Sequence, residues 1–307
     1  MEKVSSRLII GVITAITLIF ALIGINAHSV HAAQATINLG SAAPFAILAG
    51  TPNITDAGNL SVITGNVGLS PASGAGIGLL CPQVTGTIYS VDAGGPVLCR
   101  VTNGPLMVNA KNSLTAAYLD AAGRTPLTTV PTELGGTTLT PGVYDSTSTR
   151  FGITSGAGPL TLNGQNDTSS VFIFQAPFSG TGLTVGSASN IILTNGARAC
   201  NIFWRVDTAS IGTTANFIGN ILALNSITVA NGATIQGRLL AQNGNVTLIN
   251  DTITISTCAG NDTVETPTPG FPNTGSIISN SLFIIVPSII TLAIVSLALI
   301  ARKKRLL

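Results

Sequence analysis

The chain has 307 residues, of which 45% are hydrophobic and only 8% are charged, with a formal net charge of +2. The net positive charge comes from the two ends, because residues 34–270 contain seven Lys and Arg against ten Asp and Glu. That central stretch lacks the basic surface on which nucleic-acid binding depends, so we expect no nucleic-acid partner. Its roughly 225-residue exported part is long enough for one substantial core.

The first 35 residues are typical of a secretory signal. A short polar start with net positive charge precedes an apolar run over residues 8–25, and small residues follow at Ala32, Ala33 and Ala35. This order predicts a signal peptide over residues 1–35 that is removed on export. The apolar run is also long enough to stay as an uncleaved membrane anchor.

Short strands separated by turns are predicted at the start of the exported domain, which we place at residues 36–258. The strings INLGSAAPFAILAG (Ile37–Gly50) and TGNVGLSP (Thr64–Pro71) combine strand-forming residues with Gly and Pro. We predict an irregular insert between Pro71 and Val101.

One helix is predicted after this insert. Pro105 is suited to the first turn of a helix, and Gly123 to its end. Small or apolar residues recur between them at helical spacing, which predicts a helix able to lie close against a sheet; they are Leu106, Ala110, Leu114, Ala117 and Ala121.

Similar strings recur in the C-terminal half of the domain. The strings are FIFQ, NIFWRV, GNILAL and GRLLAQ, beginning at Phe172, Asn201, Gly219 and Gly237, and the last three stand 18 residues apart. Stretches of Thr, Asn, Gly, Ser and Ala separate them. Short repeats of strand and turn residues predict a β-solenoid, a fold that presents flat and regularly spaced side chains.

Four cysteines lie in the exported part, where an even number favours two disulfides. Three pairings are possible. We favour Cys81–Cys99, which closes a local loop, and Cys200–Cys258, which ties the last strand to the repeats. The spacings do not match those of zinc or thiol-redox motifs, and we expect no metal or cofactor.

Enzymatic chemistry has little support in the sequence. Both histidines, His28 and His31, lie in the signal segment, so the domain has no Ser-His-Asp or Cys-His system. Paired carboxylates remain as an alternative, but Asp145, Asp167 and Asp207 are far apart and are flanked by turn residues. We expect a protein that is not an enzyme.

The C-terminal end has three parts after a Thr/Pro linker over residues 259–270. FPNTG at residues 271–275 (Phe271, Pro272, Asn273, Thr274 and Gly275) precedes an apolar run at 277–301 and a basic tail at 302–307. The run is long enough to span a membrane, with the basic tail on the cytoplasmic side. The order resembles the LPxTG-type sorting signal that a sortase transpeptidase joins to the cell wall, with Phe271 in place of Leu. A plain membrane anchor is the alternative, and both place the domain at the cell surface.

Several strings of the domain, in order, resemble the microbial ice-binding-like family, also called the ice-binding adhesin-like domain. They include INLGSAAPFAILAG, TGNVGLSP, VFIFQ and NGARACNIFWRV, and the resemblance covers about Ala35 to Cys258. It implies a discontinuous right-handed β-solenoid of triangular cross-section with one long α-helix packed alongside, all-β apart from that helix.

In that family one flat face carries hydroxyl groups and binds ice, and some members have T-(A/G)-x-(T/N) steps on it. Similar steps here place candidate ice-binding residues at Thr181, Thr184, Thr213, Thr214, Asn216, Asn231, Thr234, Thr252 and Thr254. In the last step Asp251 would bring a charge to the face, and the register would slip by one residue after Thr234.

The resemblance favours a surface-anchored, monomeric ice-binding protein whose partner is the ice crystal surface. A non-enzymatic adhesin that binds glycan or another cell is the alternative. Each Thr named above is also an ordinary strand residue.

Overall fold

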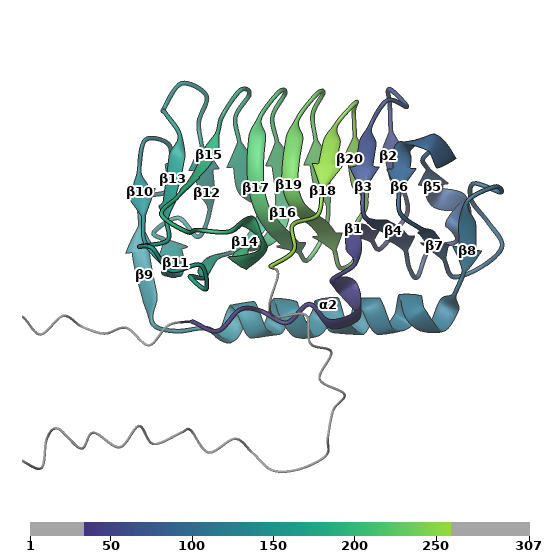
Figure 1. Ribbon diagram of the computed structural model, residues 1–307, viewed down its shortest axis with the longest axis horizontal. Coiled ribbons are helices and arrows are strands. Elements are labelled where there is room, and N and C mark those ends of the chain that lie inside the picture. The colour runs from purple at the N-terminus through teal and green to yellow at the C-terminus, as the bar shows by residue number, and fades with distance from the viewer. Residues whose placement is uncertain (1–33, 259–307) are drawn as a thin grey trace, which may run out of the picture. The chain divides into compact units, whose positions relative to one another are not determined.

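Parallel strands dominate the structure, a computed structural model that describes residues 34–258 except for the side chains of residues 177 and 178. Among these residues, eighteen strands join one sheet, three more form a small second sheet, and one α-helix, α2 (Gly104–Gly123), runs along the stacked strands (Figure 1). The β-dominated fold with one helix is as predicted. The strand registers divide the strands into three rows.

The first row lies under α2, and we call it the helix row. Its inner side chains enter the core and its outer ones meet the helix, so the strands in the middle of the row are largely apolar on both sides, as FAILA in β1 illustrates. In spatial order the row contains β9 (Leu127–Val130), β11 (Gly142–Ser146), the first parts of β14 (Phe172–Val185) and β16 (Ile202–Ile211), the second parts of β17 (Asn216–Ala223) and β19 (Thr234–Ala241), β1 (Phe45–Ala49), β4 (Asn66–Leu69), β7 (Ile88–Ser90) and β8 (Arg100–Thr102).

The second row, which we call the hydroxyl row, follows the helix row along the chain. Its strands alternate buried apolar residues with outward-facing small or hydroxyl residues, as the burial of β18 illustrates. The row contains β12 (Phe151–Ile153), the second parts of β14 and β16, β18 (Ile227–Val229), β20 (Val246–Leu248), β2 (Ile54–Asp56) and β5 (Ile77–Gly78).

The third row, the mixed row, carries Thr, Asn, Gln and Ile on its outer side. A bridge between Asn190 and Asn216 joins the small three-stranded sheet to the rest of this row. The row contains β10 (Thr138–Leu139), β13 (Leu160–Asn163), β15 (Ile191–Thr194), the first parts of β17 and β19, β21 (Thr252–Thr254), β3 (Val62–Thr64) and β6 (Val84–Thr85).

The repeated strings of the sequence lie side by side in the helix row. Phe174 pairs with Trp204, Trp204 with Ile221, and Ile221 with Leu239. The rings of Phe174 and Trp204 stack in the interior with centroids 3.9 Å apart. We call one passage of the chain through the three rows a coil. The repeat arises because each coil adds a strand to the helix row beside the strand of the previous coil, and both faces of that strand are buried.

Helix α2 is held at its start and along its length. Asn103 caps it by accepting a hydrogen bond from the Leu106 backbone at 3.0 Å, and Pro105 occupies its first turn. Ala110, Ala117 and other small residues pack on the helix row, as predicted. Four short 3₁₀ turns also lie within residues 34–258: η1 (Gly40–Ala42), η2 (Gly74–Gly76), η3 (Cys81–Gln83) and η4 (Ala199–Asn201).

The predicted irregular insert between Pro71 and Val101 is wrong. Strands β5, β6 and β7 continue all three rows through this stretch, in parallel register with β2, β3 and β4. These strands have only two or three residues each, too few for a periodic pattern to appear in the sequence. Disulfides join Cys81 to Cys99 and Cys200 to Cys258.

The predicted sorting motif at 271–275, the apolar run at 277–301 and nearly all of the predicted signal peptide lie outside the described residues. Within residues 34–258, no helix combines the length and the apolar character needed to cross a membrane.

Candidate functional site

The outer side of the hydroxyl row carries one side chain from each strand in a straight line. The strand registers pair these positions directly, so neighbouring hydroxyls repeat at the strand spacing of about 4.7–4.9 Å. We call this line the hydroxyl ladder; it consists of Thr184, Ser210, Thr228, Thr247 and Thr55. Gly152 and Gly78 continue it at the two ends. The ladder is a regular, uncharged array of five hydroxyl groups.

Rigid support underlies this ladder. Each ladder residue lies between two inward-facing residues of the core, such as Ile227 and Val229 around Thr228, both fully buried. Beside the ladder, the Ser226 hydroxyl donates to the Asn245 side-chain oxygen at 2.7 Å, and the Asn245 amide donates to the Thr247 hydroxyl at 2.9 Å. These hydrogen bonds restrict the side-chain rotamers, so the outer side is fixed before anything binds.

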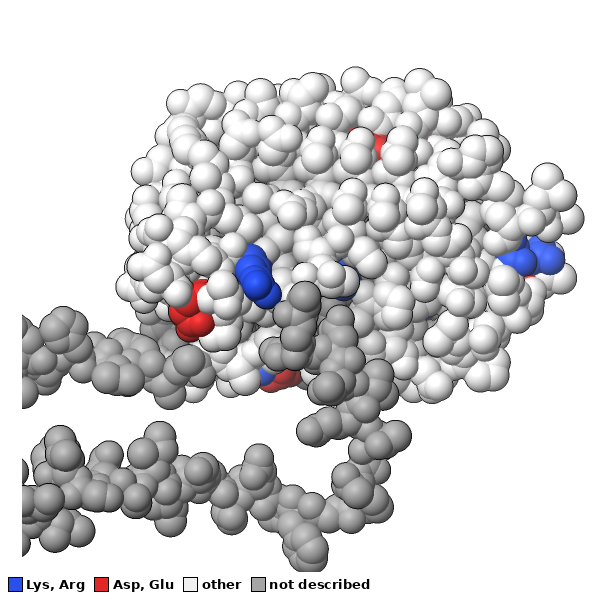
Figure 2. Space-filling view, viewed as in Figure 1, with Lys and Arg blue, Asp and Glu red and all other residues white. Residues whose placement is uncertain are grey.

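The mixed row is also without charge along its central columns but is less even. Asn216, Thr234 and Thr252 stand in register, and the Asn216 amide donates to Asn190 at 2.6 Å. Next to this column, larger side chains project, including Ile192 and Gln236, which are exposed. Figure 2 shows that the face seen there carries few charged side chains.

The candidate residues from the sequence do not form one face. Thr184 belongs to the hydroxyl ladder, and Thr181 pairs with Thr208 at the start of the same row. Four candidates stand on the mixed row, in β17, β19 and β21; they are Asn216, Thr234, Thr252 and Thr254. The remaining three occupy the corner between the two rows; they are Thr213, Thr214 and Asn231. The steps that begin at Thr213 and Asn231 cross this corner, whereas the step from Thr181 to Thr184 stays in one row, so motif spacing cannot by itself define a flat surface.

Four members of the ladder are absent from the residues predicted by motif: Ser210, Thr228, Thr247 and Thr55. A different signal marks three of them, because Ser210, Thr228 and Thr247 are each the hydroxyl in an apolar–hydroxyl–apolar triplet such as ITV at 227–229 or VTL at 246–248, whereas Thr55 stands before Asp56. Alternation of this kind is typical of a strand with one buried side. The triplets recur 18 or 19 residues apart, a pattern that T-x-x-T steps do not capture.

Two expectations about the last step were wrong. Thr252 pairs directly with Thr234, so the register does not slip. The corner before β21 is one residue shorter than the corner before β19, so the change in spacing is confined to the corner and the strands stay in register. Asp251 is only 1% exposed and points into the core, so it brings no charge to the outer side.

Asp251 and Asp56 form a buried acidic pair beneath that corner. Burial raises the pKa of Asp251 to about 6, although the backbone N–H groups of Ile249 and Ala233, each 2.8 Å away, favour its anion. Burial also opposes ionisation of Asp56, but hydrogen bonds from Ser61, Asn250 and Gln83 outweigh it and lower its pKa. The pair shapes the corner between the hydroxyl row and the mixed row.

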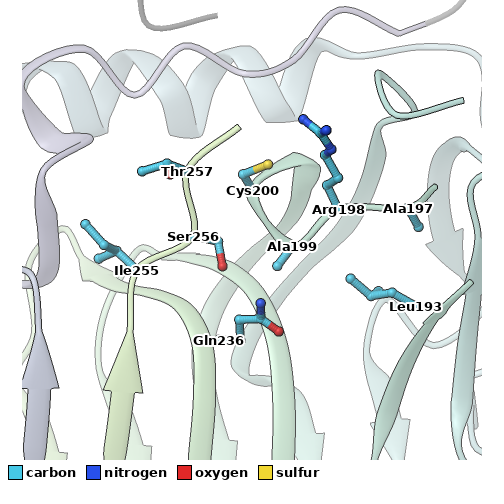
Figure 3. Close-up of a pocket in the computed structure, with 9 residues that line it drawn as sticks. All are labelled: Leu193, Ala197, Arg198, Ala199, Cys200, Gln236, Ile255, Ser256 and Thr257. Atoms are coloured by element: carbon cyan, nitrogen blue, oxygen red, sulfur yellow. The ribbon is translucent and has the colours of Figure 1, made fainter. Parts of the chain in front are cut away.

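Two of the three carboxylates considered for catalysis bind neighbouring turns and backbone, and the third, Asp145, lies within β11. Asp167 accepts hydrogen bonds from the Ser169 backbone and hydroxyl, and Asp207 accepts from Gly180 and Asn225. A groove of about 350 Å³ lies beside Cys200, and Figure 3 shows its lining. Its lining residues, which include Leu193, Gln236 and Ile255, contain no carboxylate. Acid–base chemistry of the paired-carboxylate kind has no support at this groove.

A parallel stack with uncharged, regularly spaced outer side chains defines a protein that offers an extended binding surface. Comparisons with known proteins identify its family. The model of the family described as Ice-binding-like matches residues 47–254. The ice-binding protein of Flavobacterium frigoris is 44% identical over 223 residues, covering 71% of this chain and 76% of that protein. The chain belongs to the Ice-binding-like family.

Further relatives agree with this placement. The ice-binding protein of a Colwellia species is 43% identical over 225 residues, covering 72% of this chain and 84% of that protein. Among solved structures, an ice-binding protein from an Antarctic biological consortium is 38% identical with a TM-score of 0.64, covering 74% of this chain and 94% of that one.

Proposed function

We propose that the protein binds ice through the hydroxyl row. The observation that carries this proposal is the hydroxyl ladder, five in-register hydroxyls on one side of a chain whose relatives are named as ice-binding proteins. The hydroxyls hold water molecules at a spacing close to a repeat of the ice lattice. The apolar Thr methyl groups hold little water, so little has to be displaced when ice binds. Each contact is weak, and many made together on a rigid surface hold the protein on a growing crystal.

The hydroxyl row is preferred to the mixed row for geometric reasons. Gly152 and Gly78 continue its ladder, so nothing larger than a Thr side chain stands along that line. The mixed row places Ile192, Ile218 and Gln236 side by side with its Thr residues, and these longer chains hold a flat crystal away. The acidic pair stays inside the corner and leaves both sides neutral.

The proposal also covers the shape of the domain, its export and its attachment to the cell. The three rows are taken as the sides of a right-handed triangular solenoid. Residues 1–35 direct export and are removed, and the FPNTG motif at 271–275 is the substrate of a sortase that links the protein to the cell wall. The order of signal, domain, linker, motif, apolar run and basic tail supports this. The protein would then bind ice at the cell surface.

The test compares two exposed threonines six residues apart. Thr228→Lys puts a long charged side chain in the middle of the hydroxyl ladder, whereas Thr234→Lys puts the same side chain on the mixed row. Both positions are exposed, so each change should alter the free energy of unfolding by only about 0.5 kcal/mol. We expect Thr228→Lys to weaken ice recrystallisation inhibition by roughly tenfold or more, and Thr234→Lys to change it little.

The reverse ranking would move the ice-binding surface to the mixed row. An unmodified domain that lets crystals coarsen as buffer does would defeat ice binding and leave adhesion as the function. A glycan ligand has less support, because the ladder offers no aromatic ring for a sugar to stack on.

A further inference from the structure

One coil of the stack is assembled from both ends of the described domain. Its hydroxyl-row and mixed-row sides are β20 and β21, the last strands of the chain to be described, while its helix-row side is β1, the first. The hydroxyl ladder crosses from the C-terminal to the N-terminal part here, because Thr247 of β20 pairs with Thr55 of β2. We call the contacts of β1, β2 and β3 with β19, β20 and β21 the seam.

The coil is broken at the corner where β21 ends and β1 begins. Arg238, which is 5% exposed, lies at this corner and reaches both loose ends. Its Nε donates to the Ala43 carbonyl at 2.8 Å, just before β1, and its Nη1 donates to the Ser256 carbonyl at 3.0 Å, just after β21. One guanidinium therefore joins two segments that are more than 200 residues apart in sequence.

A second connection lies beside it. Cys258, two residues after Ser256, is bonded to Cys200 in the turn before β16. Asn220 links the two features, since it accepts from Arg238 at 2.8 Å and donates to the Cys200 and Ile202 carbonyls at 3.2 and 3.0 Å. In Figure 3, Cys200 and Ser256 both line the groove at this corner. We call Arg238, Asn220 and the Cys200–Cys258 disulfide the clasp.

We propose that the clasp is the positioning element of the ice-binding surface: it holds β20 and β21 in the seam and so keeps the hydroxyl ladder continuous between Thr247 and Thr55. The proposal rests on the proposed function of that ladder. Strands β20 and β21 have three residues each and end the described chain, and terminal segments open first unless they are tied down. Reduction of one disulfide would then cut the ladder in two.

Amide hydrogen exchange on the folded domain tests the clasp directly. Cys200→Ser/Cys258→Ser and Arg238→Met should each speed exchange in β2, β3, β20 and β21 by about tenfold or more relative to β16 and β17. Arg238→Lys keeps the charge but lacks the forked guanidinium that reaches several acceptors, so its exchange rates in these strands should lie between those of the unmodified domain and Arg238→Met. The matched control is Cys81→Ser/Cys99→Ser, which removes the disulfide beside β5 and β6, on the other side of β2 and β3 from the clasp, and should leave exchange in β20 and β21 unchanged.

Thermal hysteresis then separates positioning from general stability. With the clasp intact, Thr55→Lys and Thr184→Lys should each lower hysteresis. In the Cys200→Ser/Cys258→Ser background, Thr55→Lys should lower thermal hysteresis no further, because its part of the ladder is already detached. Thr184→Lys should still lower it. Additive losses at both positions would overturn the proposal.

Two further outcomes are decisive as well. If the clasp variants do not fold, stepwise reduction of the folded domain at low temperature gives the same comparison. Seam amides that exchange no faster than β16 after loss of the Cys200–Cys258 bond contradict the clasp. A wild-type domain without ice activity defeats the proposed function, yet the exchange pattern still decides whether the clasp holds the seam.

Discussion

Asp251 occupies an inner corner position where the adjoining coils carry small residues such as Ala233 and Ala215. Its carboxyl group is buried beside Asp56, and the pKa values of the two groups shift in opposite directions although burial favours the protonated form of both. Asp251 has a folded-state pKa raised to about 6 from 3.8, whereas Asp56 has its pKa lowered. Each carboxylate accepts from two backbone N–H groups, but Asp56 also accepts from the Gln83 side-chain amide and, at 5% exposed against 1% for Asp251, is slightly less buried.

This pair predicts a pH dependence of stability. Between about pH 4 and 6 the folded state holds a proton on Asp251 that the unfolded state has lost, so this group's contribution to the free energy of unfolding falls as pH rises. Asp251→Asn should remove that fall, which urea unfolding from pH 4 to 7.5 would measure.

Asp56→Asn provides the opposite control. The lowered pKa of Asp56 stabilises the fold above about pH 4 and that contribution is lost on acidification, so this variant should be weakened at neutral pH. A wild-type and an Asp251→Asn protein with parallel pH profiles would contradict the assignment.

Strand alternation in the sequence already places Asp251 inside, because Thr252 and Thr254 point outward on either side of Ile253. Motif spacing led instead to an exposed charge. The helix was predictable from its proline, its final glycine and its spacing of small residues, all of which act locally. The ladder was not found, because each coil supplies only one hydroxyl to it and the register between coils is a tertiary property.

At the scale of elements, the bends of the long strands decide the geometry. Strands β17 and β19 pass from the mixed row to the helix row at Gly219 and Gly237, which pair with each other. A Cβ built on Gly237 would lie 1.9 Å from the Gly219 carbonyl oxygen, far inside contact distance. Only glycine lets the two bent backbones approach this closely.

Gly237→Ala should therefore destabilise the domain by about 3 kcal/mol or more, because backbone atoms must move to admit the methyl group. Gly123→Ala is the matched control, since a methyl group there, at the end of α2, would meet no described atom within 4 Å beyond its chain neighbours and the adjacent backbone of α2. That change should be neutral or stabilise by up to about 1 kcal/mol. Chemical denaturation measures both, and equal effects would show that the bend does not depend on close approach.

At the scale of the whole molecule, two parts of the chain complete one stack. Helix α2 runs along the stack from β8 to β9, so the strands after it are added back toward the first coils until β19 meets β1 (Figure 1). No local pattern foretells that Ile47 pairs with Leu239, almost two hundred residues away. The resemblance to a family implied a discontinuous fold; the residues that join its two parts, Arg238 above all, emerge from the packing.

The most direct measurement is the partition of fluorescently labelled residues 34–258 into a slowly growing ice hemisphere, with the disulfides intact. We expect the unmodified domain and Thr234→Lys to enter the ice, and Thr228→Lys to remain in the liquid. Exclusion of the unmodified domain, or entry of Thr228→Lys to the same extent, would contradict binding through the hydroxyl row.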